Sequence, residues 1–149
     1  MNISDIISKD SIRLDVEATS KQEAIEQMAG LLASAGHVSD AAQFVSDVLA
    51  REATGSTGIG FGVAIPHGKS AGVASPGLSF VKFKEPVEWN SLDQQPVVMA
   101  FLIGVPYDHA GQEHLKILTT LARKLIHESF REQLKGAATA DDILQALQF

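Results

Sequence analysis

Cysteine is missing from this chain of 149 residues. Without a thiol the protein has no disulfide bond, no thiolate nucleophile and no cysteine ligand for a metal ion. Any nucleophile must therefore be another residue type. The lack of cysteine is also compatible with a reducing compartment such as the cytoplasm.

Long apolar segments and basic clusters are missing as well. No apolar run approaches the roughly 20 residues of a membrane-spanning helix. The N-terminal sequence MNISDIISKDSI lacks the basic start and apolar core of a signal peptide. The 12 basic residues are scattered and outnumbered by 18 acidic ones, which leaves no electrostatic footprint for nucleic acid. We therefore expect a cytoplasmic protein that binds no nucleic acid and does not insert into a membrane.

The chain does contain enough apolar sequence for one core. Hydrophobic residues make up 45% of it, so one domain over residues 1–149 is expected. A capping box formed by Ser20 and Glu23 predicts the start of a first helix. Ser39 is the expected cap of a second helix, which runs toward Arg51.

Helical spacing of apolar residues returns in the last third of the chain. It predicts a helix over residues 111–127 and a last helix opened by Thr139 with Asp142. Strands are predicted near residues 13–16, 62–65, 78–83 and 97–103. The last of these is almost wholly apolar, as is typical of a strand covered on both faces. Together the elements predict an α/β fold, with a mixed central sheet flanked by helices on both faces.

A glycine-rich stretch, STGIGFGVAIPHGKS over residues 56–70, ends like a nucleotide-binding P-loop. The spacing argues against that function, because five residues separate Gly62 from Gly68 where a P-loop has four. Pro66 also has no N–H to donate to a phosphate. The stretch is therefore not predicted to bind a nucleotide.

Histidines are the other candidates for a site. None of the five lies in an HExxH motif or shows the carboxylate spacing of a hydrolytic metal site, so no metal or cofactor is predicted. They are His37, His67, His109, His114 and His127.

The residues around His67 are of the types that would present its imidazole at the end of a strand. A strand over residues 63–65 would deliver it, Pro66 would stiffen the approach, and Gly68 would remove bulk beyond the ring. A neutral imidazole is a nucleophile when one ring nitrogen keeps its lone pair and the other N–H is held, commonly by a backbone carbonyl. The alternative is a surface histidine in a turn.

The residues around His67 resemble a known signature. Glu52, six further positions and the pattern Ile-Gly-x-x-Val-Ala-Ile-Pro-His-Gly over residues 59–68 look like the phosphorylation site of fructose/mannitol-type enzyme IIA domains. These domains belong to the bacterial phosphoenolpyruvate-dependent sugar phosphotransferase system. The resemblance extends over essentially the whole chain.

The resemblance implies a fold and a set of roles. The family has an α/β domain with a mixed sheet, in which His67 would accept phosphate from the histidine phosphocarrier protein HPr and pass it to a cysteine of a IIB domain. His114 and Arg51 fall on the family's second active-site histidine and its arginine. A membrane IIC permease would then take up fructose or a related sugar or hexitol. The alternative is the nitrogen-related branch, whose phosphorylation state controls other proteins.

The chemistry of these residues fits such transfer without a cofactor. A moving phosphoryl group needs positive charge and donors for its equatorial oxygens, which a guanidinium at Arg51 and an imidazole at His114 near a helix start would supply. The alternatives are a helix C-terminal cation at Arg51 and a solvated helix residue at His114.

The glycine-rich residues 58–62 are also candidates for a role at the site. Their backbone N–H groups are expected to approach an anion, because little side-chain bulk surrounds them. Ile59 and Phe61 either contact a partner protein or face the core.

Overall fold

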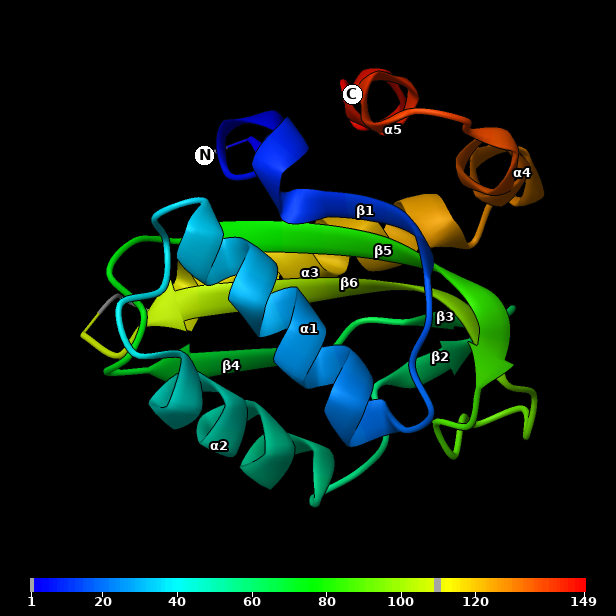
Figure 1. The fold of residues 1–149 in the computed structure, drawn as a ribbon. Coiled ribbons are helices and arrows are strands. Elements are labelled where there is room, and N and C mark those ends of the chain that lie inside the picture. The colour runs from blue at the N-terminus through cyan, green and yellow to red at the C-terminus, as the bar shows by residue number, and fades with distance from the viewer. Residues whose placement is uncertain (1, 109–110) are drawn as a thin grey trace.

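A computed structural model describes residues 2–108 and 111–149, except for the side chains of residues 111–114. Within these ranges six strands and five α-helices follow one another along the chain (Figure 1). The strands are β1 (Ile12–Val16), β2 (Gly58–Gly60), β3 (Val63–Ala64), β4 (His67–Ser70), β5 (Gly77–Val87) and β6 (Val97–Pro106). The helices are α1 (Lys21–Ser34), α2 (Ala41–Glu52), α3 (Gly111–Leu125), α4 (Glu128–Gly136) and α5 (Ala140–Ala146).

The strands of the described residues form one mixed sheet. Its order is β1-β5-β6-β3-β2, and β4 also pairs with β6. β1 runs parallel to β5, while β3 and β4 run parallel to β6. The pairs β5–β6 and β2–β3 are antiparallel. The prediction of a mixed sheet is thus confirmed.

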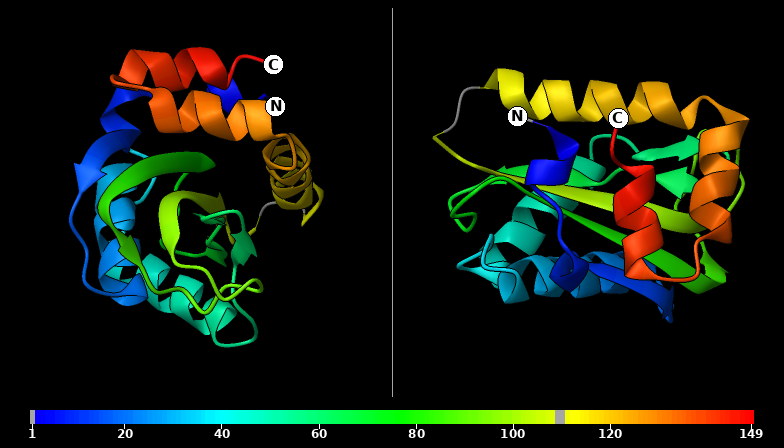
Figure 2. Two further views of the ribbon diagram at one scale, coloured as in Figure 1. Left: turned by 90° about the vertical axis from the view of Figure 1, so that its right-hand side faces the viewer. Right: turned by 90° about the horizontal axis from the view of Figure 1, so that it is seen from above.

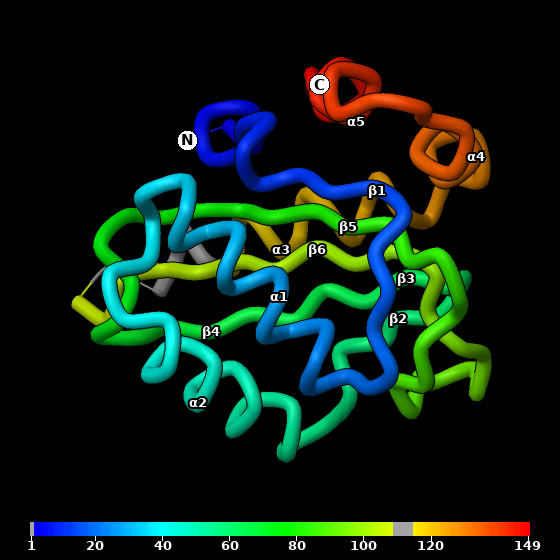
Figure 3. Tube along the Cα trace, in the orientation of Figure 1, coloured from blue at the N-terminus to red at the C-terminus, as the bar shows by residue number. Residues whose placement is uncertain are grey.

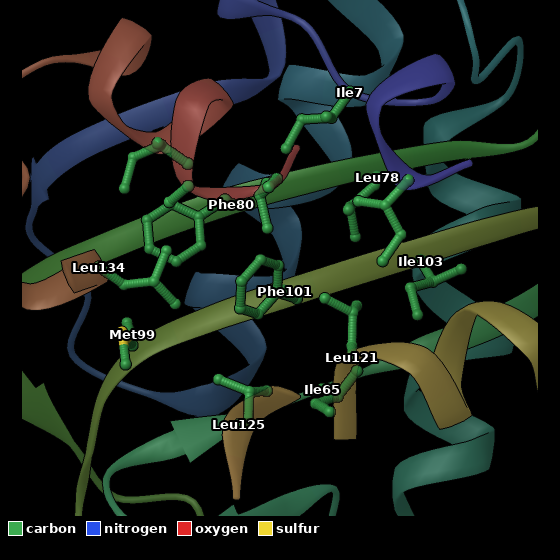
Figure 4. Close-up of a cluster of buried hydrophobic side chains, with 14 of the residues drawn as sticks. Ile7, Ile65, Leu78, Phe80, Met99, Phe101, Ile103, Leu121, Leu125 and Leu134 are labelled. Atoms are coloured by element: carbon green, nitrogen blue, oxygen red, sulfur yellow. The ribbon is translucent and has the colours of Figure 1, made fainter. Parts of the chain in front are cut away.

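Helices cover both faces of this sheet, as predicted (Figure 2). α1 and α2 pack on one face against residues that include Ala100 and Leu102 of β6. α3, α4 and α5 pack on the other face, where the rings of Phe80 and Phe101 lie 4.8 Å apart between centroids (Figure 4). Neighbouring residues of β6 alternate between the two layers, because successive side chains of a strand point to opposite faces. Both ends of the chain lie on the same side of the sheet as α5 (Figure 3).

The helix starts follow the predicted capping in part. Ser20 caps α1 by accepting the N–H of Glu23, but the Glu23 carboxylate bonds the hydroxyl of Thr19, so only half of the capping box forms. The prediction that Ser39 caps α2 is wrong, because Asp40 precedes the first helical residue and accepts a backbone N–H of the first turn. Ser39 instead donates to a backbone carbonyl.

The last part of the chain has one helix more than predicted. The capping box of Thr139 with Asp142 opens α5, as predicted. The helix predicted over residues 111–127 ends at Leu125, and α4 follows it directly. No helix within residues 2–108 and 111–149 has both the length and the apolar character needed to cross a membrane.

The strand predicted near residues 62–65 is shorter in the structure, and a further strand follows it. β3 covers Val63 and Ala64, and β4 begins at His67, beyond the N–H-lacking Pro66. Both strands keep one register along β6, where Val63 faces Met99 and His67 faces Ile103. His67 therefore follows the end of one strand, as predicted, and also begins the next, which was not predicted.

Candidate active site

The side chain of His67 is held by its own chain. Its Nδ1 lies 2.9 Å from the carbonyl oxygen of Ile65. A carbonyl oxygen only accepts hydrogen bonds, so Nδ1 carries the proton and the lone pair of the neutral ring lies on Nε2. The sequence left open which carbonyl would hold the ring, and the structure identifies it.

The surroundings favour the neutral form of this imidazole. Burial lowers the pKa of His67 below its ordinary value of 6.5 and is the largest influence. The hydrogen bond to Ile65 and the charge of Glu52 raise the pKa, whereas the charge of Arg51 lowers it. The net pKa is lowered, so the ring is predominantly neutral near neutral pH and Nε2 is a competent nucleophile.

Arg51 lies in the last turn of α2, as predicted, and its charge reaches His67. Its guanidinium bends back over the turn that follows the helix. Nη1 donates to the carbonyl oxygen of Gly55 over 2.8 Å and to the hydroxyl of Thr54 over 3.2 Å. The structure therefore brings Arg51 within electrostatic range of the imidazole, and the side chain also serves the helix end.

The second predicted histidine lies at the start of α3. The helix spans Gly111–Leu125, so the backbone of His114 is in its first turn. The side chain of His114 lies outside the described residues, as does His109. The position of His114 relative to His67 therefore stays a prediction.

Gly68 allows α2 to approach β4 closely. A Cβ at this position would lie 3.0 Å from Cγ2 of Val48, which is fully buried in α2. The sequence predicted that Gly68 clears space beyond the His67 ring, but the space that it clears is filled by α2. This contact positions the end of α2, where Arg51 lies.

The glycine-rich residues before His67 are arranged differently from the prediction. The N–H of Gly58 donates to Ser56 Oγ and that of Phe61 to Asp93 Oδ2, so the protein itself occupies both groups. Val63 and His67 lie four positions apart along β6, which places the turn before β3 at least roughly 13 Å from His67. The N–H groups of Gly58 and Phe61 are therefore directed at protein oxygens, which argues against their expected approach to an anion.

The two apolar residues of that segment have separate surroundings. Ile59 packs against the buried core of the α3 face. Phe61 is 51% exposed and has a positive φ of 61°. The centroid of its ring lies 4.0 Å from Cζ of the Arg131 guanidinium. Of the two alternatives, the core therefore applies to Ile59 and not to Phe61.

The structure adds a buried polar cluster that sequence reasoning missed, which we call the Glu52 network. The Glu52 carboxylate accepts hydrogen bonds from the hydroxyl and the N–H of Thr57. It also pairs with Lys21 Nζ at 3.1 Å, and the Trp89 indole N–H donates to the Thr57 hydroxyl over 3.2 Å. A sequence signal existed, because a carboxylate in the last turn of a helix opposes the helix dipole and needs partners.

Metal binding has no support in the described geometry. Among the described side chains, which leave out those of residues 109–114, no three histidine, aspartate or glutamate groups lie together so that they could hold a metal ion. The arrangement around His67 instead offers a neutral imidazole with a nearby permanent positive charge. Such a pair is suited to accepting and holding an anionic group.

Known proteins resemble the chain over nearly its whole length. Residues 5–149 match the family described as phosphoenolpyruvate-dependent sugar phosphotransferase system, EIIA 2. A fructose-specific EIIA component of that system from Haloferax volcanii is 35% identical over 98% of this chain and 94% of its own length. The chain spans only 22% and 23% of the length of two other curated relatives, which are EIIABC components.

Solved structures share the fold. The nitrogen regulatory protein IIA-Ntr from Neisseria meningitidis is 36% identical and superposes with a TM-score of 0.88 over 98% of this chain and 99% of its own. A complex of enzyme IIAMTL and phosphorylated enzyme IIBMTL from Escherichia coli contains a chain that is 25% identical. That chain superposes with a TM-score of 0.80 over 95% of this chain and 98% of its own.

Proposed function

Because the chain belongs to the EIIA 2 family of the phosphoenolpyruvate-dependent sugar phosphotransferase system, we propose that His67 carries a phosphoryl group between two partner proteins. The observation that supports this role best is the hydrogen bond from Nδ1 of His67 to the carbonyl oxygen of Ile65. It leaves the ring lone pair on Nε2, the nitrogen remote from the backbone. Nε2 of His67 is then the atom that is phosphorylated.

The proposed step is an in-line displacement at phosphorus. Nε2 of His67 attacks the phosphoryl group of a phosphohistidine donor, the donor's N–P bond breaks, and the donor imidazole keeps the electron pair of that bond. Nδ1 of His67 keeps its proton throughout and donates it in a hydrogen bond to the carbonyl oxygen of Ile65. In the second step a thiolate of the acceptor attacks phosphorus, and the electron pair of the N–P bond returns to Nε2.

Arg51 and His114 are assigned the role of stabilising the negative charge of the phosphoryl group during transfer. In the transition state, charge spreads over the equatorial oxygens of the phosphoryl group, and fixed donors aimed at those oxygens lower the barrier. Arg51 is supported by its electrostatic range to His67. His114 is supported by the resemblance and by its place in the first turn of α3, where the helix dipole favours an anion.

The partners follow from the family and its relatives. We assign the donor role to the phosphocarrier HPr and the acceptor role to a cysteine of a IIB domain, in the cytoplasm. The Escherichia coli complex of enzyme IIAMTL with phosphorylated enzyme IIBMTL supports an acceptor of this class. The fructose-specific relative supports fructose or a related sugar or hexitol, delivered through a membrane IIC permease.

The decisive experiment is phosphorylation in vitro. Incubation with phosphoenolpyruvate, enzyme I and HPr should place an acid-labile phosphate on the wild-type chain and none on His67→Ala. His127→Ala is the matched control, because His127 is an exposed histidine at the start of α4. Label that persists in His67→Ala would refute the assignment.

A regulatory role is the second candidate, and the likeness to nitrogen regulatory protein IIA-Ntr favours it. In that role His67 would accept phosphate in the same way, but the two forms would bind other proteins with different affinity. Transfer from the phosphorylated chain to a panel of purified IIB domains separates the candidates. Rapid transfer to one of them supports transport, and a phosphate that none of them removes supports regulation.

A further inference from the structure

Thr57 connects the Glu52 network to His67 through the backbone. The carbonyl oxygen of Thr57 accepts the N–H of Ile65 over 3.0 Å. The carbonyl oxygen of Ile65 in turn accepts Nδ1–H of His67 over 2.9 Å. Both distances are those of ordinary hydrogen bonds. A displacement of Thr57 would therefore move the acceptor that orients the His67 ring.

The same turn of the chain holds Arg51. Residues 53–57 lead away from the end of α2, and the Arg51 guanidinium is bonded to two oxygens of this turn, at Thr54 and Gly55. The Glu52 carboxylate closes the turn by reaching Thr57 at its far end. The turn over residues 53–57 thus links the guanidinium to the peptide that holds the imidazole.

The partners of the Glu52 carboxylate come from distant parts of the chain. Lys21 is the first residue of α1, and Trp89 follows β5. Glu52 is 8% exposed and Thr57 is 5% exposed, so their polar atoms have little contact with water and depend on each other for hydrogen bonds. A buried ion pair of this kind adds little net stability. Loss of one of its partners is costly, however, because it leaves a buried charge without compensation. Arrangements that break any of these contacts are therefore disfavoured.

We propose that the Glu52 network is the positioning device of this site. It holds the turn over residues 53–57 so that the Arg51 guanidinium and Nε2 of His67 face the same phosphoryl group. Lys21, Glu52, Thr57 and Trp89 are positioning residues, since they act through Arg51 and Ile65. This inference rests on the proposed phosphoryl transfer to His67.

Thr57 offers the cleanest test, because two substitutions separate its hydroxyl from its shape. Thr57→Val removes the hydroxyl at nearly constant volume, and Thr57→Ser keeps it. We expect Thr57→Val to slow transfer from phosphorylated HPr to His67 by on the order of tenfold, the effect of one hydrogen bond to a charged group. Thr57→Ser should stay close to the wild-type rate.

A double-mutant cycle distinguishes positioning from general damage. If Thr57 acts through Arg51 as well as through Ile65, Thr57→Val should cause a smaller loss in the Arg51→Ala background than in the wild type, because one of the two groups that it positions is already gone. An equal loss in both backgrounds would overturn the inference, as would an unchanged rate of Thr57→Val. Where Thr57→Val does not fold, Lys21→Gln with Lys21→Arg as its control replaces it, since Lys21 is partly exposed.

Two spectroscopic measurements test the geometry without transfer. Trp89 is the single tryptophan of the chain, so a change in its surroundings can be followed by its emission, which should shift in Thr57→Val and stay close to the wild type in Thr57→Ser. In a ¹H–¹⁵N spectrum, the Nδ1–H signal of His67 should weaken in Thr57→Val and persist in Thr57→Ser. An unaltered signal in Thr57→Val would overturn the inference.

The wild-type control keeps the two proposals apart. A wild-type chain that takes no label from phosphorylated HPr refutes the proposed function. A labelled wild type with an equally fast Thr57→Val refutes only the positioning role.

Discussion

His67 donates its Nδ1–H to the carbonyl oxygen of Ile65, two residues earlier in the chain, over 2.9 Å. Pro66 lies between them and fixes its own φ, which limits how far the two can move apart. The bond selects the tautomer in which Nε2 is the nucleophile. The proposal that Nε2 is the phosphorylated atom thus rests on a local contact of the backbone.

This contact predicts different outcomes for two substitutions of His67. The amide of an asparagine can replace the Nδ1–H donor to Ile65, whereas the amide of a glutamine corresponds better to Nε2. Both His67→Asn and His67→Gln should carry no acid-labile phosphate. Urea unfolding should find His67→Asn close to the wild type and His67→Gln less stable by about 1 kcal/mol, the usual value of one hydrogen bond. Equal stability of the two variants would argue against the contact.

The lowered pKa of His67 predicts a pH dependence of stability. An unfolded histidine has a pKa of about 6.5, and burial lowers the pKa of His67 in the folded chain. Between the two values the unfolded state binds more protons, so stability is lost as the pH falls below the unfolded value toward the folded one. Urea unfolding over about pH 5 to 8 should show this loss in the wild type and a smaller one in His67→Asn.

The same pKa should respond to Arg51. Its positive charge disfavours protonation of His67, so Arg51→Ala should raise the pKa of His67. Glu52→Gln should lower it, because the negative charge of Glu52 acts in the opposite direction. NMR titration of the ring measures both shifts. A pKa of His67 that falls in Arg51→Ala would contradict the proximity of the two side chains.

Arg51 should also determine the rate of transfer. Loss of a fixed donor to the transition state commonly costs on the order of 100-fold or more, so Arg51→Ala should be slow in stopped-flow transfer, and so should His114→Ala. Arg51→Lys should recover only part of the rate, because an ammonium lacks the planar fork. Arg13→Ala is the control, since Arg13 is exposed on β1 at the edge of the sheet. A wild-type rate in Arg51→Ala or His114→Ala would remove that residue from the site.

The close approach of α2 to β4 predicts the effect of a single methyl group. Gly68→Ala would place a Cβ 3.0 Å from the buried Val48 side chain and should destabilise the fold by about 1 kcal/mol or more. Val48→Ala should cost less in the Gly68→Ala background than in the wild type, because it removes the overlap. Gly30→Ala is the matched control, since nothing lies within 4 Å of a Cβ there. It should be neutral or stabilising, because Gly30 lies within α1.

Local sequence signals predicted much of the fold. The serine cap of α1, the capping box of α5 and the apolar run of β6 are recognisable because each depends on residues close in sequence. β4 escaped prediction, since the sequence His-Gly-Lys-Ser has no apolar alternation and the strand exists only through its pairing with β6. The cap of α2 was assigned one residue too early, because Ser39 and Asp40 are both good caps.

The order of residues along the chain was enough to place Arg51 at a helix end and to exclude a thiol, and its resemblance to a family signature made His67 the candidate for the reacting residue. These conclusions follow from residue types and short spacings, which are local properties. The partners of Glu52, the contact of Gly68 with Val48 and the burial that lowers the pKa of His67 arise only on folding. Lys21 and Glu52 lie 31 positions apart, and packing of α1 against α2 brings their charges together. Long-range contacts of this kind depend on how whole elements pack, so the tertiary structure alone reveals them.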